Sequence, residues 1–110
     1  MEKKFKLRAD EIVDLIPNMG GCIATDRITV DGMPVGYMYR SAASNEIDSG
    51  WCFFAGDETQ EYIDDLRNST VYAVNTIANY DRTIIPYLEL PVGVELEKNA
   101  AGDGFDLLPG

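Results

Sequence analysis

The spacing of apolar residues along the chain predicts short helices mixed with short strands. Near the start, Ile12, Leu15 and Ile16 recur at helical spacing with acidic residues nearby, and Pro17 follows them. This pattern is typical of a short amphipathic helix that ends before the proline. The glycine pair after it leads into an apolar stretch at residues 22–25, which we expect to be a strand.

The clearest local pattern predicts a β-hairpin. Residues 28–30 and 35–39 both alternate between apolar and polar positions, and Asp31-Gly32 stands between them. Asp-Gly favours a tight turn of this kind because both central positions need positive φ. In the second strand, Tyr37 and Tyr39 would share one face.

Two elements are expected in the middle of the chain. The continuous apolar run at residues 51–54 predicts a strand covered on both faces. Asp57 and Gln60 then stand at capping-box spacing, which predicts a helix that starts after Asp57 and continues to about residue 67.

Three further elements are expected in the last part of the chain. Residues 71–74 predict a strand, and residues 75–88 predict two short helical pieces because Pro86 forbids one straight helix. Residues 91–97 alternate cleanly and predict a final strand with one wet face.

Together these elements predict an α+β fold. They lack the regular βαβ repeat of a parallel sheet, so we expect a mainly antiparallel sheet with a β-hairpin and two or more helices packed on one side. We interpret residues 1–110 as a single domain with an N-terminal helical segment (1–20), a core (21–97) and a C-terminal tail (98–110). We expect the apolar residues of the tail to hold it against the rest of the domain.

The charge of the chain narrows the classes of partner. Nineteen acidic residues stand against nine basic ones, which gives a formal net charge of −10. Such a surface repels phosphate, so nucleic acid and anionic membranes are not expected partners. It favours a basic protein partner by steering its approach, although an acidic surface can also serve solubility alone.

The apolar stretches are all too short to predict a membrane span, and the start of the chain does not follow a secretory pattern. We therefore expect a cytoplasmic protein. In that reducing compartment Cys22 and Cys52, each within an apolar run, should be buried thiols.

The residue types argue against catalysis. The chain has no histidine, which removes the commonest general base and a common metal ligand, and it has no phosphate-binding or calcium-binding motif. We expect no catalytic residues, no bound metal and no cofactor. One enzyme hypothesis stays open: Asp57, Glu61 and Asp64 at helical spacing could hold Mg²⁺ or form an acid/base pair. The alternative is that they form a solvated face of a helix.

A protein-binding site is the more favoured hypothesis. Acidic residues next to an aromatic ring suit an arginine or lysine of a partner, through ion pairing and cation–π contact. Tyrosine, with an apolar body and a polar tip, also suits an interface. The alternative for the tryptophan is a place in the core. The predicted interface is centred on Trp51, Asp57 and Glu58 and surrounded by Asp48, Tyr37, Tyr39 and Arg40.

Three blocks of sequence carry a resemblance to a known family. They are residues 24–40 (ATDRITVDG followed by VGYMYR), 48–58 (DSGWCFFAGDE) and 75–88 (NTIANYD followed by IIPYL). In these blocks the chain resembles a bacterial family that was first described as a domain of unknown function and later grouped with the immunity proteins of polymorphic toxin systems. One departure is Cys52, which stands where the family pattern has a basic residue.

The resemblance implies a cytoplasmic protein that neutralises a cognate toxin by direct binding and that has no catalytic residues. A basic toxin, such as a nuclease, would fit the acidic surface. The alternatives are a housekeeping or regulatory binding domain of the same fold and a carboxylate-based, metal-dependent hydrolase. The oligomeric state stays unknown at this stage.

Overall fold

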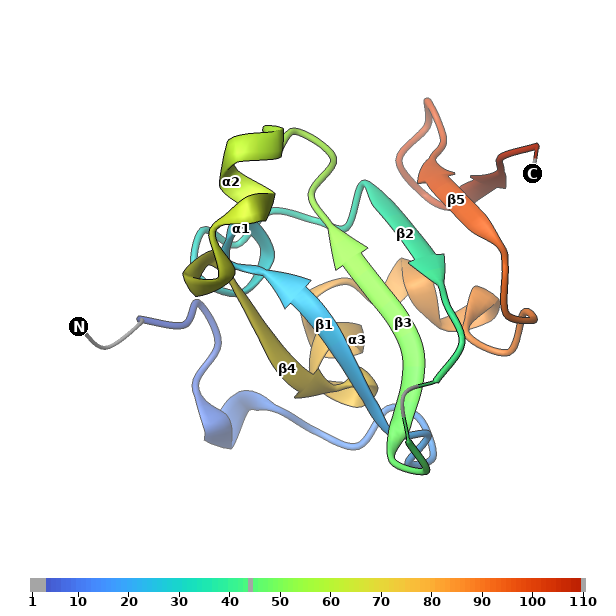
Figure 1. Cartoon of the computed structure of the whole chain (residues 1–110). Helices are drawn as coiled ribbons and strands as arrows, with labels where there is room; N and C mark the ends of the chain where they lie inside the picture. Colours follow the sequence, from blue (N-terminus) through green and yellow to red (C-terminus); the bar gives the residue numbers. More distant parts are fainter. Residues whose placement is uncertain (1–3, 44, 110) are drawn as a thin grey trace.

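The computed structural model, which describes residues 4–43 and 45–109, is built around one six-stranded sheet (Figure 1). The strand order is β4-β1-β3-β2-β5-β6. The strands are β1 (Gly21–Thr25), β2 (Tyr37–Arg40), β3 (Asp48–Phe54), β4 (Ser69–Ala73), β5 (Glu95–Lys98) and β6 (Phe105–Leu107). Only the β1–β3 pairing is parallel, and the other four pairings are antiparallel. The predicted α+β class with a mainly antiparallel sheet is confirmed.

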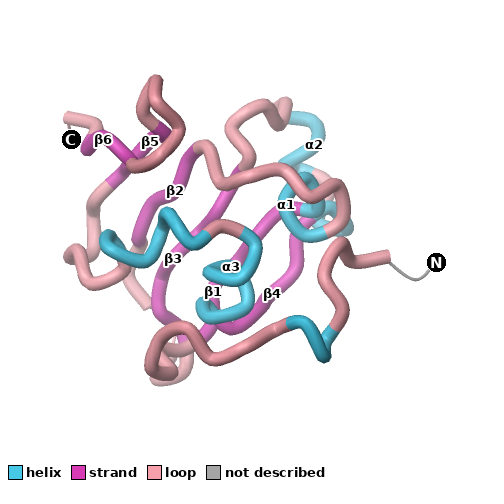
Figure 2. Tube along the Cα trace, turned by 180° about the vertical axis from the view of Figure 1, so that it is seen from behind, coloured by secondary structure: helices cyan, strands magenta, loops and turns pink. Residues whose placement is uncertain are grey.

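The helices are short and unevenly placed. They are α1 (Asp26–Thr29), α2 (Gln60–Asp64), α3 (Val74–Tyr80) and the 3₁₀ helices η1 (Ala9–Glu11), η2 (Leu66–Asn68) and η3 (Arg82–Tyr87). Seen from behind, α3 and the chain that follows it cross one face of the sheet, whereas α1 and α2 lie at one end of it (Figure 2). Within the described residues, every helix falls short of the length and apolar character that crossing a membrane requires.

The core lies between α3, η3 and the face of the sheet that they cover. Its members are apolar side chains with at most 6% exposure, contributed by the strands and by the helices over them. The sheet and the adjacent loop supply Cys22, Ala24, Val35, Met38, Trp51, Phe53, Leu96 and Phe105. The helical side supplies Ile28, Val74, Ile77, Ala78, Ile84 and Leu88. Burial of this apolar area is the main favourable term in folding.

The predicted N-terminal helix is wrong, because only the three-residue η1 forms there. The chain after it runs extended along α3. The side-chain amide of Asn75 accepts a hydrogen bond from the Leu15 amide at 2.8 Å and donates one to the Val13 carbonyl at 2.9 Å. Asn79 accepts from the Val13 amide at 3.1 Å. These amide side chains replace the hydrogen bonds that a helix would have made within the segment.

The predicted hairpin at residues 28–39 is also wrong. Residues 26–29 form α1, and β2 pairs with β3 and β5. Ile28 and Thr29 are neighbours in sequence and both are fully buried, which a strand with one covered face does not allow. Gly32, at φ +78°, follows the helix and accommodates the turn after it. Antiparallel hairpins do form elsewhere, between β2 and β3 and between β5 and β6.

The start of α2 differs from the prediction as well. Its N-cap is Thr59, whose hydroxyl accepts a hydrogen bond from the Tyr62 amide at 3.1 Å. Asp57 stands outside the helix and forms an ion pair with Arg27 instead. The strand predicted at 51–54, the two helical pieces at 75–88 and the two buried free thiols are confirmed.

Candidate protein-binding surface

The face of the sheet opposite α3 is turned toward the viewer in Figure 1 and, among the described residues, has no helix lying over its central rows. Strand register places side chains on this face in two rows, since directly paired residues point the same way. One row crosses five strands as Val71, Ile23, Cys52, Tyr39 and Glu95. The other contains Phe54, Tyr37, Glu97 and Asp106. We call these two rows, together with Ile47 beside them, the open face.

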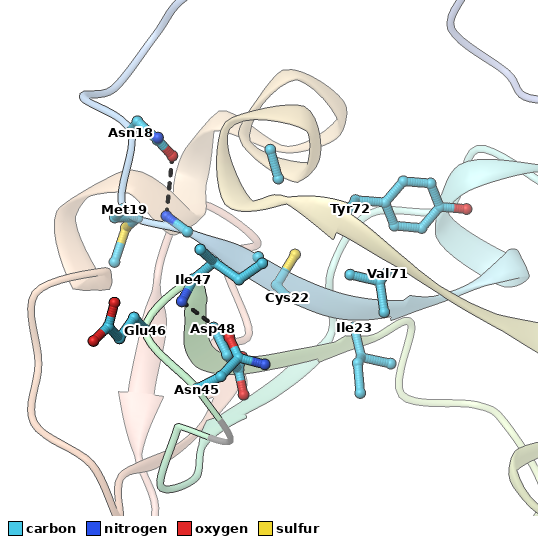
Figure 3. Close-up of a pocket in the computed structure, with 13 residues that line it drawn as sticks. Asn18, Met19, Cys22, Ile23, Asn45, Glu46, Ile47, Asp48, Val71 and Tyr72 are labelled. Atoms are coloured by element: carbon cyan, nitrogen blue, oxygen red, sulfur yellow. Dashed lines mark hydrogen bonds between the residues drawn. The ribbon is translucent and has the colours of Figure 1, made fainter.

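The first part of the open face is apolar. Val71, Ile23 and Ile47 have exposed fractions of 71%, 45% and 77%. They line a surface hollow of about 840 Å³ at the start of β1, and acidic Glu46 and Asp48 stand at its margin (Figure 3). Three exposed aliphatic side chains around one hollow are more than the scattered single exposures of an ordinary surface.

The second part is aromatic. The ring of Tyr39 stacks on Phe54 with centroids 5.8 Å apart, and Tyr37 lies 5.7 Å from Phe54 and 6.1 Å from Tyr39. All three side chains are half-buried. Such packing holds the rings in place, so they offer a rigid surface with polar hydroxyl groups at its edge.

Cys52 lies beneath this aromatic part with only 8% exposure. Its thiol is hydrogen-bonded to the hydroxyl of Tyr39, which pairs with it across β2 and β3. Burial raises the pKa of Cys52, so the thiol stays neutral at pH 7. The hydrogen bond to Cys52 and burial together raise the pKa of Tyr39 to about 12. The residue that departs from the family pattern is therefore on the open face, but it supports Tyr39 from below.

The third part is acidic. Glu95 and Glu97 on β5 and Asp106 on β6 are exposed. The hydroxyl of Tyr37 donates a hydrogen bond of 2.6 Å to Glu95. Burial and then this hydrogen bond raise the pKa of Tyr37 to about 12, so it remains a donor at pH 7. The two rows contain three carboxylates and no lysine or arginine.

Several basic side chains elsewhere form ion pairs within the protein. Arg27 pairs with Asp31 and Asp57, Arg67 pairs with Asp65, and Lys98 pairs with Asp81. The hydrogen bonds that Arg27 donates to Asp57, followed by the one it donates to Asp31, raise the pKa of Arg27. Because these cations neutralise acids away from the open face, the face keeps the negative charge of its own carboxylates.

Two residues of the predicted interface point away from this surface. Trp51 is 1% exposed, lies in the core, and donates its indole hydrogen bond to the Leu88 carbonyl at 3.0 Å. Arg40 lies 5.7 Å from the Trp51 ring and donates to the carbonyls of Ser49 and Leu90 at 2.9 and 2.8 Å. The alternative reading of the tryptophan as a core residue is the one that the structure supports.

The predicted acids do not gather around an aromatic ring. Asp48 begins β3, whereas Asp57 and Glu58 follow its other end. The carboxylate of Glu58 accepts hydrogen bonds from the Thr25 hydroxyl at 2.5 Å and from the amides of Ala55 and Gly56 at 2.8 and 2.9 Å. Glu58 therefore organises the turn after β3. Of the predicted set, Tyr37 and Tyr39 lie in the two rows of the open face, and Asp48 lines the hollow beside them.

The carboxylates of Asp57, Glu61 and Asp64, which could hold Mg²⁺ if they shared one helix, do not lie on one helix. Asp57 precedes α2 and is bound to Arg27, while Asp64 accepts a hydrogen bond from Gln60 at 2.8 Å. Within residues 4–43 and 45–109, no group of three or more cysteine, aspartate or glutamate side chains is placed to hold a metal ion.

Sequence reasoning missed the apolar part of the open face. Ile23 and Val71 lie within strands that were predicted, but a short apolar run does not reveal which face is covered. Ile47 falls between the predicted strands, in a mostly polar stretch where no element is expected. Glu95 and Glu97, by contrast, could be found from the alternation at residues 91–97, which predicted one wet face.

Comparisons with known proteins identify the family of the chain. A search of the curated proteins and a search of the solved structures gave no significant match. The family model of the immunity protein Imm33 domain matches residues 22–106, which include all six strands except the first residue of β1 and the last of β6. The chain therefore belongs to the Imm33 immunity protein domain family.

Proposed function

We propose that this protein is an immunity protein that neutralises a cognate toxin by binding it directly, without catalysis. The family match over residues 22–106 is the observation that carries the proposal. The open face supports it, since an exposed apolar area beside rigid aromatic rings is the usual composition of an interface core.

The charge of the protein supports the choice of a protein partner over other ligands. With a net charge of −10, the molecule repels polyanions and attracts basic proteins over distances of about one Debye length. Fast association is valuable to an antagonist, which must reach its target before the target acts. We further propose that the protein works in the cytoplasm, where Cys22 and Cys52 remain thiols.

The test is calorimetry between the purified protein and the C-terminal toxin domain encoded beside its gene. We expect a stoichiometric complex at micromolar concentration or below, with weaker binding when the salt concentration is raised from about 50 to about 300 mM. In cells that produce the toxin domain, co-expression of this protein should restore growth.

The matched control is an unrelated immunity protein of similar charge, which should neither bind nor protect. If the toxin domain fails to bind at micromolar concentration and co-expression gives no protection, the proposed function is wrong for this pair. Protection without binding would point to a catalytic or indirect mechanism instead.

A further inference from the structure

We infer that the open face is the docking surface and that its occupant is a basic protein segment carrying an apolar side chain next to arginine or lysine. This inference rests on the proposed function in one respect, which is that the partner is a toxin. It adds to that function the surface used and the chemistry recognised there.

The apolar hollow sets the first requirement on the occupant. Val71, Ile23 and Ile47 expose aliphatic carbon around a volume of about 840 Å³, which is large enough for one or more apolar side chains. In Figure 3 Val71 and Ile23 lie next to each other and point the same way, with Ile47 to their left. Filling this hollow would remove their surfaces from water, which favours association.

The aromatic and acidic parts set the second requirement. A cation placed over Tyr37 or Tyr39 would face the negative side of the rings. It would also approach Glu95 and Glu97 on the neighbouring strand β5. Because the two rows hold no basic side chain, these carboxylates are available to pair with a guanidinium or ammonium group from outside.

The arrangement of the two parts selects for a protein segment over a small cation. Val71 and Glu95 lie at opposite ends of one row that crosses five strands. At about 4.8 Å between neighbouring strands, the row spans roughly 19 Å. Only an extended or helical polypeptide reaches both ends with one apolar and one cationic side chain.

The surface can be tested directly with a probe peptide. The isotope-labelled protein is titrated with acetyl-Arg-Leu-Arg-Leu-Arg-amide while the backbone amide resonances are followed by NMR. We expect saturable shifts on β1, β2, β4 and β5 at the open face, with weak affinity. The matched peptide with glutamate in place of arginine should cause none. Absence of saturable shifts, or shifts confined to α2 and the acids around it, would overturn the inference.

Two variants on the open face sharpen the test. Val71→Glu places a charge in the hollow, and Glu97→Lys reverses a charge beside the rings. Both positions are exposed, so the fold should be retained. The matched controls are Val13→Glu and Glu89→Lys, which lie outside the two rows. Val13 is exposed and hydrogen-bonded to Asn79 on α3, across the sheet from the open face.

With the toxin domain as ligand, each open-face variant should weaken binding by about tenfold or more, and each control by less than about threefold. Glu97→Lys should in addition reduce the salt dependence of the association rate. If the wild-type protein binds and both open-face variants bind as tightly as it does, the surface is wrong while the proposed function stands. If the toxin domain does not bind but the peptide shifts follow the expected pattern, the surface stands and the proposed partner is wrong.

Discussion

Replacing Asp81 with asparagine should destabilise the fold more than any surface change. Asp81 is 8% exposed and stands between α3 and η3. One carboxylate oxygen accepts from the Thr83 amide at 3.0 Å and from its hydroxyl at 2.5 Å. The other accepts from the Val35 amide at 3.0 Å and from the Lys98 ammonium at 2.7 Å. One side chain thus joins three separate parts of the chain.

The expected loss of folding free energy follows from the interactions that the asparagine side chain cannot replace. Asp81→Asn turns one oxygen into a donor group, which must then face either the Thr83 donors or the Val35 and Lys98 donors. It also leaves the ammonium of Lys98, 17% exposed, without its counter-charge. Breaking a buried pair costs about 3–5 kcal/mol, and the partial exposure of Lys98 places this case near the lower end, at about 3 kcal/mol.

The assay is urea denaturation at pH 7, followed by the fluorescence of the single tryptophan, Trp51, which is buried in the core. The control is Lys98→Met, alone and combined with Asp81→Asn. The double variant should lose less than the sum of the two single losses, because it leaves no unpaired charge. A loss below about 1 kcal/mol for Asp81→Asn would refute the reasoning.

The same residue gives a prediction about pH. Burial tends to raise the pKa of Asp81, but the hydrogen bonds from Lys98 and Thr83 together outweigh it and lower the pKa below 3.8. The folded state therefore holds the proton less tightly than the unfolded state. This stabilisation is fully present above about pH 4 and is lost as the pH falls through the folded pKa. Asp65, with its pKa lowered to about 2, acts in the same direction, so the difference between wild type and Asp81→Asn is the informative quantity. That difference should shrink below pH 4, and a constant difference would contradict the assignment.

Three further predictions concern backbone strain, the core and a helix cap. Gly50→Ala should cost at least about 2 kcal/mol in urea denaturation, because φ is +86° and the new Cβ would lie 2.0 Å from the Ser41 carbonyl oxygen. Trp51→Phe should cost about 2 kcal/mol, measured by thermal melting followed by circular dichroism, because it loses a buried indole hydrogen bond, yet it should leave toxin affinity unchanged. Thr59→Ala should cost about 1 kcal/mol because it removes the N-cap of α2, whereas Asp57→Ala should change the melting temperature little. If Asp57→Ala is the more destabilising of the two, Asp57 is the N-cap, as the sequence predicts.

Much of the sheet could be predicted because its strands carry strong local patterns. The apolar run at residues 51–54 forms β3, with Trp51 and Phe53 in the core and the half-buried Phe54 on the open face. The alternation at 91–97 continues into β5, whose glutamates are exposed. Two helical pieces form at 75–88 as the proline predicts, but the break between them falls at Asp81, and Pro86 lies inside η3. The local sequence is therefore enough to predict these elements without knowledge of their contacts with the rest of the chain.

The remaining elements depend on distant contacts. Residues 28–30 alternate as a strand does, but Ile28 and Thr29 are both drawn into the core beside α3. Residues 12–16 have helical spacing, but the side chains of Asn75 and Asn79 hold that segment extended. The residues of the predicted interface are divided between the two faces of the sheet for a similar reason. Trp51 and its acidic neighbours are close in sequence, whereas the pleat of β3 turns Trp51 to the covered face.

The order of strands in the sheet also determines when the molecule can first act during its synthesis. Both neighbours of β1 come later in the chain, since β1 pairs with β3 and then with β4 at residues 69–73. A nascent chain that stops before residue 69 lacks β4, so it has Ile23 without Val71 beside it, and its β1 has an unpaired edge. Pairings over such separations close slowly compared with local hairpins. Under the proposed function, most of this chain must therefore be translated before it can bind a toxin.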